Sequence, residues 1–251
     1  RQALTFLLSA GLLLRLKTRK LQQIVFPPKS PRGIIRIMTV QAKICGINSP
    51  VAMKAAVEGG ASYIGLVFYP RSPRAVTVTE AVHLAKLVPG TVQKVGLFVN
   101  ITDDLLDSVL EQLSLDILQL HGKETPERVS EIKNLTGLPV MKAIHIENSA
   151  DFSEIERYTG VADQILFDAK VPKNMENALP GGNAISFDWT LFGNRQWQEN
   201  WMLSGGLTAN NVGEAIRISG AQSVDVSSGV ETKPGQKDTK LIDAFLETVL
   251  A

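Results

Sequence analysis

The stretch Ala42–Phe68, AKICGINSPVAMKAAVEGGASYIGLVF, contains one complete strand–helix–strand unit. Its two ends, Ala42–Cys45 and Tyr63–Phe68, are short apolar runs of the kind that form strands. Between them, SPVAMKAAVEGGA has the apolar spacing of an amphipathic helix, and Gly59-Gly60 stands where a helix is expected to end. Because strands joined through a helix pair in parallel, this stretch predicts a parallel sheet covered by helices.

The same unit repeats to the end of the chain. Six further strand-like runs follow: Lys94–Val99, Ile117–Leu120, Val140–Ile144, Gln164–Phe167, Trp201–Leu203 and Ser223–Val226. Helical patterns separate them, such as TDDLLDSVLEQL, in which Thr102 is a suitable N-cap before two aspartates. Eight such units in 251 residues predict a single-domain α/β fold, the (β/α)8 or TIM barrel. A doubly wound open sheet is the alternative, but no Gly-x-Gly-x-x-Gly follows the first strand.

The composition is that of an ordinary globular protein. The chain is 44% hydrophobic and 20% charged, and its formal net charge is +1. This charge gives no reason to expect nucleic acid or a membrane surface as a partner. With one cysteine, Cys45, the chain cannot form an internal disulfide, which is compatible with the reducing cytoplasm.

The first 37 residues differ from the rest. Ala3–Leu16, ALTFLLSAGLLLRL, is apolar but interrupted by Arg15 and too short to cross a bilayer. The basic and proline-rich stretches RLKTRK and FPPKSPRG follow it. The expected domain begins at Met38, so we divide the chain into a non-barrel N-terminal extension, 1–37, and a barrel domain, 38–251. Three readings of the extension are open: an upstream segment from a misplaced start codon, a targeting peptide, or a structured element.

In a barrel of this kind, the active site lies at the C-terminal ends of the strands. The residues expected there are Cys45, Arg71, Arg74, Asn100, Gln119, His121, Lys142, His145 and Asp168. A cysteine near cationic groups can be partly thiolate and act as a base, although a lone cysteine is more often inert core. An aspartate after the apolar run ILF can have a raised pKa and act as an acid, or it can be a loop cap or an ion-pair partner. One base and one acid at one barrel mouth predict the isomerisation of a sugar phosphate.

Two Ser/Gly turns, Ser204–Gly206 and Ser227–Gly229, follow the last two strands. Glycines let the backbone approach a ligand closely and direct N–H groups toward an anion. The loops after strands seven and eight are the recurrent phosphate site of this fold, usually beside a helix N-terminus. The two turns therefore predict a phosphate site, with Thr208 or Asn210 opening the next helix; the alternative is two ordinary turns.

Arginine and histidine complete the set of candidates. Arg74, in a loop stiffened by Pro73, suits a planar carboxylate, whereas Arg71 fits a solvated loop side chain. The three histidines are scattered and show no metal-ligand spacing, so no metal or cofactor is predicted. We expect His83 on a helix surface, and His121 either lining the pocket or orienting a neighbour.

Nine motifs in order resemble one known family. They are KICGI, GLVFYPRSPRAV, VGLFVN, LQLHG, MKAI, LFDAK, GGNAISFDW, LSGGL and VDVSSGVETKPGQKD, and they cover Val40 to the C-terminus. Together they resemble phosphoribosylanthranilate isomerase of tryptophan biosynthesis. The resemblance implies a (β/α)8 barrel that needs no cofactor. It also implies an Amadori rearrangement of N-(5-phosphoribosyl)anthranilate to 1-(2-carboxyphenylamino)-1-deoxyribulose 5-phosphate.

The resemblance also implies residue roles. Cys45 matches the general base and Asp168 the general acid. Arg74 matches the arginine that holds the anthranilate carboxylate, and Asp225 is expected to face a sugar hydroxyl. The remaining substrate-binding residues are those of the phosphate turns and of the mobile loop: Gly205, Gly206, Ser227, Ser228, Gly229, Gly182 and Asn183. Ala184 stands where a glycine is usual in that loop, which implies a stiffer loop and puts its phosphate contact in doubt.

Other functions remain as alternatives. An isomerase of histidine biosynthesis, or a bifunctional relative, uses two aspartates, whereas the first strand here ends in Cys45. A sugar-phosphate epimerase is expected to have metal-binding histidines at several strand ends. A non-catalytic phosphate sensor or assembly subunit needs no acid–base pair. As partners we expect a small substrate with a phosphate and a carboxylate, in a monomer or homodimer. The cytoplasm is the first expectation for location, and a plastid the second if the extension is a transit peptide.

Overall fold

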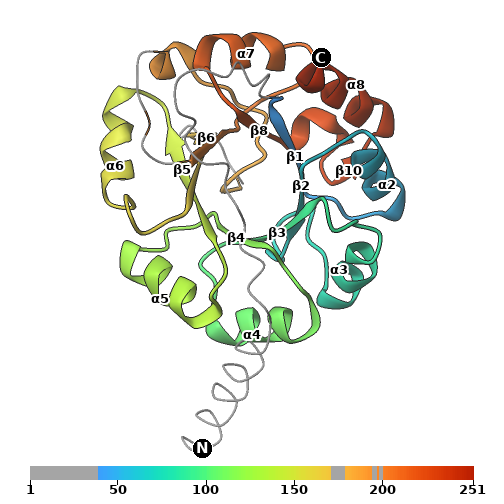
Figure 1. Ribbon diagram of the computed structural model, residues 1–251, viewed down its shortest axis with the longest axis vertical. Coiled ribbons are helices and arrows are strands. Elements are labelled where there is room, and N and C mark those ends of the chain that lie inside the picture. Colours follow the sequence, from blue (N-terminus) through green and yellow to red (C-terminus); the bar gives the residue numbers. More distant parts are fainter. Residues whose placement is uncertain (1–38, 171–178, 194–196, 198–199) are drawn as a thin grey trace, which may run out of the picture.

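The computed structural model describes residues 39–170, 179–193, 197 and 200–251. Eight parallel strands close into a barrel, in which each strand pairs with the next along the chain and β8 pairs with β1. Figure 1 shows the strands as an inner ring with the helices around them. The predicted (β/α)8 barrel is confirmed, and the open-sheet alternative is wrong. The predicted extension, 1–37, lies outside the described residues.

The eight barrel strands coincide with the eight predicted ones to within two residues at either end. They are β1 Gln41–Cys45, β2 Tyr63–Val67, β3 Gln93–Phe98, β4 Ile117–Leu120, β5 Val140–Ile146, β6 Gln164–Ala169, β7 Asn200–Leu203 and β8 Ser223–Val226. β6 continues through Asp168, so this aspartate is held by the β5–β6 ladder, opposite His145, and does not sit on a loop.

Helices cover the outside of the barrel. The α-helices are α2 Pro50–Glu58, α3 Val78–Ala85, α4 Asp103–Gln112, α5 Pro126–Thr136, α6 Ser153–Glu156, α7 Val212–Ser219 and α8 Thr239–Leu250. The other elements in the described residues are three short 3-10 helices, η1 Ser149–Phe152, η2 Trp189–Phe192 and η3 Ser228–Val230, and a hairpin of β9 Glu231–Lys233 with β10 Gln236–Lys237. The Thr102 side chain caps α4 by accepting from the Leu105 N–H, as predicted.

The helix after β7 begins later than predicted. The sequence suggested Thr208 or Asn210 as its start, but α7 begins at Val212. The Asn211 side chain accepts from the Thr208 N–H at 2.8 Å and donates to the Gly206 carbonyl at 3.0 Å. These two hydrogen bonds fold the residues before Val212 into a turn, which the Val212 N–H closes on the Thr208 carbonyl at 3.0 Å, and the α-helix begins after this turn.

Two apolar clusters form the core in the part of the chain that the structure describes. The larger one fills the layer between the strands and the helices. The smaller one consists of strand residues alone: Tyr63, Val95, Ile117, Met141, Ala143, Leu166 and Met202. Because side chains alternate along a strand, the residues two positions further share the inward face. Along β6, Leu166 is thus followed by Asp168, and past β7, Met202 by Ser204. Toward the C-terminal ends of the strands, the inward-facing side chains therefore change from apolar to polar, and these polar side chains contribute to the site.

Candidate active site

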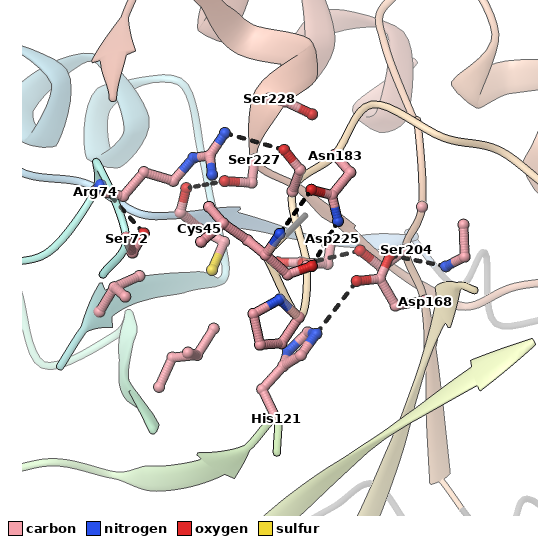
Figure 2. Close-up of a pocket in the computed structure, with 18 of the residues that line it drawn as sticks. Cys45, Ser72, Arg74, His121, Asp168, Asn183, Ser204, Asp225, Ser227 and Ser228 are labelled. Carbon is pink, nitrogen blue, oxygen red and sulfur yellow. Dashed lines mark hydrogen bonds and ion pairs between the residues drawn. The ribbon is translucent and has the colours of Figure 1, made fainter. Parts of the chain in front are cut away.

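One cavity lies at the C-terminal mouth of the barrel, and nearly all the predicted site residues line it (Figure 2). They are Cys45, Arg74, Asp168, Gly182, Asn183, Gly205, Gly206, Asp225, Ser227 and Ser228. Gly229 is the exception. A Cβ atom at Gly229 would lie 1.8 Å from the carbonyl oxygen of Leu207, so this glycine lets the turns after β7 and β8 pack backbone against backbone.

Cys45 ends β1 and is buried. Gly65 on β2 makes room for it, because a Cβ there would lie 2.8 Å from the Cys45 sulfur. Burial raises the pKa of the thiol, and the nearby ammonium groups of Lys43 and Lys237 only partly oppose this effect. The cationic neighbours expected from the sequence are therefore present, but the net effect is a raised pKa and not a lowered one.

Lys43 and Asp225 form a fully buried ion pair beside Cys45. The Lys43 ammonium lies 2.8 Å from Asp225 Oδ1, and the Ser204 hydroxyl donates to Asp225 Oδ2 at 3.0 Å. Burial alone would lower the pKa of Lys43, but Asp225 and Cys45 together raise it above its ordinary value. Lys43 is therefore a fixed cation. It was missed from the sequence, although the two-residue spacing from Cys45 puts both side chains on one face of the strand.

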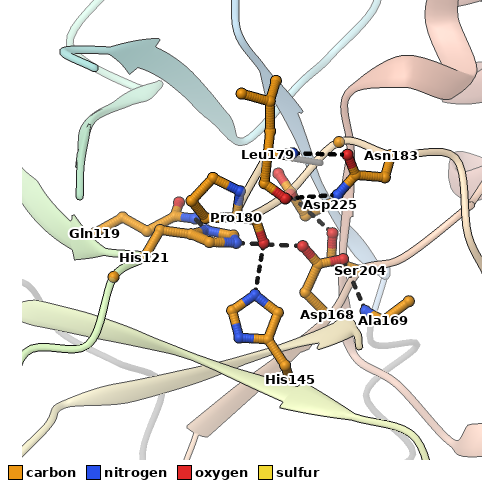
Figure 3. A network of polar contacts seen from close by, with 12 residues as sticks. Gln119, His121, His145, Asp168, Ala169, Leu179, Pro180, Asn183, Ser204 and Asp225 are labelled. Atoms are coloured by element: carbon orange, nitrogen blue, oxygen red, sulfur yellow. Dashed lines mark hydrogen bonds and ion pairs between the residues drawn. The ribbon is translucent and has the colours of Figure 1, made fainter. Parts of the chain in front are cut away.

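Asp168 is oriented by a histidine and by the backbone N–H of the next residue (Figure 3). Its Oδ2 lies 3.2 Å from His121 Nε2, and its Oδ1 accepts from the Ala169 N–H at 2.9 Å. The Gln119 amide nitrogen lies 2.9 Å from His121 Nδ1. Gln119 contacts one ring nitrogen of His121 and Asp168 contacts the other, so the two contacts fix the imidazole beside the Asp168 carboxyl group. His121 thus lines the pocket and also orients a neighbour.

His145 lies beside the same pair. Its Nε2 is 2.6 Å from the Pro180 carbonyl oxygen, so it must be the donor, and burial lowers the pKa of this imidazole. The ligand atoms of His121, His145 and Asp168 lie within 4.8 Å of one another. The prediction of scattered histidines is therefore wrong for His121 and His145, because the barrel brings β4, β5 and β6 side by side, whereas His83 lies apart on α3.

Arg74 comes from the loop after β2 and is buried in the pocket wall. Its Nε and Nη2 donate to the two carboxylate oxygens of Glu231, each at 2.8 Å. Lys237 donates to Glu231 Oε1 at 2.8 Å and to the Ser227 carbonyl at 2.9 Å. Glu231 and Lys237 belong to the β9–β10 hairpin and were not singled out from the sequence. They lie in the motif VETKPGQKD, but their charge alone does not separate them from solvated residues.

The loop from Leu179 to Ser186 lies over the pocket. The Asn183 side chain bonds to both backbone groups of Leu179, accepting from its N–H at 3.1 Å and donating to its carbonyl at 2.7 Å. Its amide is therefore used inside the loop. Ala184 adopts the left-handed conformation, with φ 56°, which fits a position where glycine is usual. A Cβ at Gly206 would lie 2.8 Å from the backbone of Ile185, so this glycine allows the loop to approach the turn.

Several strand-end candidates do not face the cavity. Arg71 and His83 are exposed, as expected. Lys142 points to the outside of the barrel, where it donates to the Gly122 carbonyl at 2.7 Å and pairs with Glu124 at 3.3 Å. Asn100 accepts from the Lys123 N–H at 2.7 Å. These two residues brace the loops around the site and do not line it.

Known proteins that resemble this chain have the function that the sequence motifs implied. Residues 42–248 match the family described as PRAI, N-(5'-phosphoribosyl)anthranilate (PRA) isomerase. The chain belongs to this family. It is 56% identical over 210 residues to the N-(5'-phosphoribosyl)anthranilate isomerase of Paramagnetospirillum magneticum. The aligned region covers 84% of this chain and 97% of the relative. Family membership confirms the predicted enzyme class, an isomerase of tryptophan biosynthesis.

Solved structures give the same result. The phosphoribosyl anthranilate isomerase of Thermotoga maritima is 34% identical with a TM-score of 0.75, over 84% of this chain and 98% of the other. That dimeric protein has also been solved as mutually generated monomers. A phosphoribosyl anthranilate isomerase in complex with reduced 1-(o-carboxyphenylamino)-1-deoxyribulose 5-phosphate is 33% identical, with a TM-score of 0.70 and the same coverage. In the described part of the chain, no helix is long and apolar enough to cross a membrane. The match to bacterial enzymes gives no support to the plastid alternative.

Proposed function

We propose that this chain carries out the family's Amadori rearrangement with Cys45 as the general base and Asp168 as the general acid. The observation that carries the proposal is their placement: the two side chains reach one cavity from β1 and β6, which are not neighbours in the barrel. A substrate between them can therefore receive a proton on one side and lose one on the other.

The reaction is divided between the two groups in order. Protonated Asp168 transfers its proton to the furanose ring oxygen, the C1–O bond breaks, and the amine lone pair forms the iminium. The Cys45 thiolate then removes the proton from C2, and the C2–H electrons form the enolamine, which tautomerises to the ketone. The His121 Nε2–H stabilises the Asp168 carboxylate left by the first step, and the Lys43 ammonium stabilises the thiolate needed for the second.

The rest of the cavity offers a place for each end of the substrate. The turns that contain Gly205, Gly206, Ser227 and Ser228 line the pocket, and they suit the phosphate because glycine lets backbone N–H groups approach an anion closely. Arg74 would hold the anthranilate carboxylate. Asp225 would accept from a sugar hydroxyl while Lys43 and Ser204 hold it in place.

The loop and the two turns contribute in a different way. With the Asn183 amide bonded to Leu179, Gly182 and Asn183 would reach the substrate through backbone groups. Gly229 acts indirectly, by allowing the turns after β7 and β8 to pack together.

We propose the same experiment for the reaction and for its substrate. Freshly prepared phosphoribosylanthranilate is mixed with the purified protein, and the loss of anthranilate-type fluorescence is followed. The protein should convert this substrate and leave a histidine-pathway aminoaldose unchanged. A folded protein that converts only the histidine-pathway compound would assign it to that reaction, and one that binds both without turnover would favour the sensor.

The remaining expectations follow from the proposed reaction. We propose that 38–251 is the catalytic domain, that it acts as a monomer or a homodimer in the cytoplasm, and that phosphate and carboxylate are the two groups it recognises. The buried, unpaired Cys45 agrees with a reducing compartment.

A further inference from the structure

Arg74, Glu231 and Lys237 form a buried trio of charges in the pocket wall. Their side chains are 5%, 3% and 0% exposed. Arg74 contacts Glu231 through two parallel N–H···O bonds of 2.8 Å, the geometry in which a guanidinium and a carboxylate fit best. The carboxylate that occupies Arg74 in this structure is therefore the protein's own, on the edge formed by Nε and Nη2.

The remaining N–H groups of Arg74 face the loop over the pocket. Of its five N–H donors, Nε and both hydrogens of Nη2 are used, the last by the Gly182 carbonyl at 3.2 Å. Nη1 has no hydrogen-bond partner among the described residues. A Cβ at Gly182 would lie 2.6 Å from Nη1, so the glycine keeps this end of the guanidinium clear of a side chain. Figure 2 shows Arg74 reaching toward the loop that carries Asn183.

Glu231 is itself fixed from behind. Lys237 donates to Glu231 Oε1 at 2.8 Å, to the Ser227 carbonyl at 2.9 Å and to the Ser227 hydroxyl at 3.3 Å. The Ser227 hydroxyl in turn donates to the Cys45 carbonyl at 3.1 Å. The orientation of Arg74 is thus tied, through Glu231 and Lys237, to the turn proposed for the phosphate and to the strand end that holds the base.

We propose that Glu231 is a positioning residue that sets the specificity of the enzyme for a substrate carboxylate. It holds one edge of the Arg74 guanidinium so that the other end, at Nη1, faces the substrate. The inference rests on the proposed function of Arg74 and deepens it: recognition belongs to the pair and not to the arginine alone.

A simpler role for Glu231 makes the opposite prediction. If it only balances the two buried cations, then Glu231→Gln leaves the trio with two positive charges and strengthens the attraction for a carboxylate. If it positions Arg74, the same change weakens carboxylate recognition. A Gln side chain has one acceptor oxygen, and its NH2 group would face a guanidinium N–H, so the two parallel bonds cannot form.

The test compares two substrates in the full-length protein. One is phosphoribosylanthranilate, and the other is the phosphoribosylaniline that lacks the carboxylate. We expect Glu231→Gln to lower the ratio of their kcat/KM values about 10- to 100-fold, mainly through KM of the carboxylate substrate. Arg74→Ala should lower this ratio by the same factor as Glu231→Gln. The double variant should lower it no further, because both changes remove the same interaction with the substrate carboxylate.

Glu231→Asp serves as the second variant. It keeps the charge but shortens the side chain by one methylene, so the ratio should still fall. Equal losses for both substrates would show a purely structural role, and a raised ratio in Glu231→Gln would show charge balance; either result overturns the proposal. If the unaltered protein does not favour the carboxylate substrate, it is the proposed function of Arg74 that fails, before the question of Glu231 arises.

Discussion

The ammonium of Lys43 and the carboxylate of Asp225 lie 2.8 Å apart inside the barrel, beside the thiol of Cys45. The two residues are 182 positions apart in the chain and meet because β1 and β8 close the barrel. Lys43 thereby serves two groups at once: it neutralises the buried Asp225, and it opposes the effect of burial on the pKa of Cys45.

The pH dependence of the reaction should reveal this arrangement. Because the proposed base, Cys45, must be a thiolate, kcat/KM should rise with pH as Cys45 loses its proton, and burial places that rise above the ordinary range of a thiol. Lys43→Met removes a cation that lowers this pKa, so the rise should move to still higher pH. Lys43→Arg keeps the charge and serves as the control. An unchanged pH profile in Lys43→Met would show that Lys43 does not act on the base.

The buried pair of Glu124 and Lys142 should matter for stability. Glu124 also accepts from the N–H groups of Asn100, at 2.6 Å, and Gly122, at 2.9 Å, so it ties two loops together. Glu124→Gln leaves Lys142 buried without a counter-charge, and we expect a loss of about 3–5 kcal/mol in the free energy of unfolding. Chemical denaturation measures it, with the exposed pair residue Glu58→Gln as control. A loss below about 1 kcal/mol would contradict the role of this pair.

Replacing Ala184 by glycine should strengthen substrate binding. Its φ of 56° costs a residue with a Cβ about 1–2 kcal/mol, and glycine removes that cost. Glycine also loses more conformational entropy when the loop is ordered, which offsets about 0.4–1 kcal/mol of the gain. In Ala184→Gly the conformation in which the loop lies over the pocket should therefore become more favourable, and KM should fall a few-fold. Ala184→Val, which is β-branched, should raise KM. Equal KM values in all three proteins would show that this backbone conformation has no influence on binding.

The sequence predicts the fold well because its signals are local. Each barrel strand is a short apolar run bounded by polar or glycine-containing segments, as in Ile117–Leu120, and these runs were found to within two residues. The capping of α4 by Thr102 is local too. The start of α7 was missed because the Asn211 side chain bonds back to the Thr208 and Gly206 backbone and holds a turn there, a contact that the residue types alone do not reveal.

The site was predictable only in part. Cys45 and Asp168 stand out because each follows an apolar run at a strand end. Lys43, His145 and Glu231 do not, because their importance comes from partners that the barrel brings near. Lys43 looks like any lysine in a strand until Asp225 lies against it, and His145 looks unrelated to His121 until β4 and β5 are paired.

The most direct test concerns the acid and the base themselves. Single-turnover rates on phosphoribosylanthranilate are measured for the unaltered protein, Cys45→Ala and Asp168→Asn, and the affinity of each for the reduced product analogue is measured in parallel. We expect each change to slow the chemical step about 100- to 10,000-fold while the analogue still binds nearly as well. Rates close to the unaltered protein in either variant, or an equal loss of binding and turnover in Asp168→Asn, would contradict it.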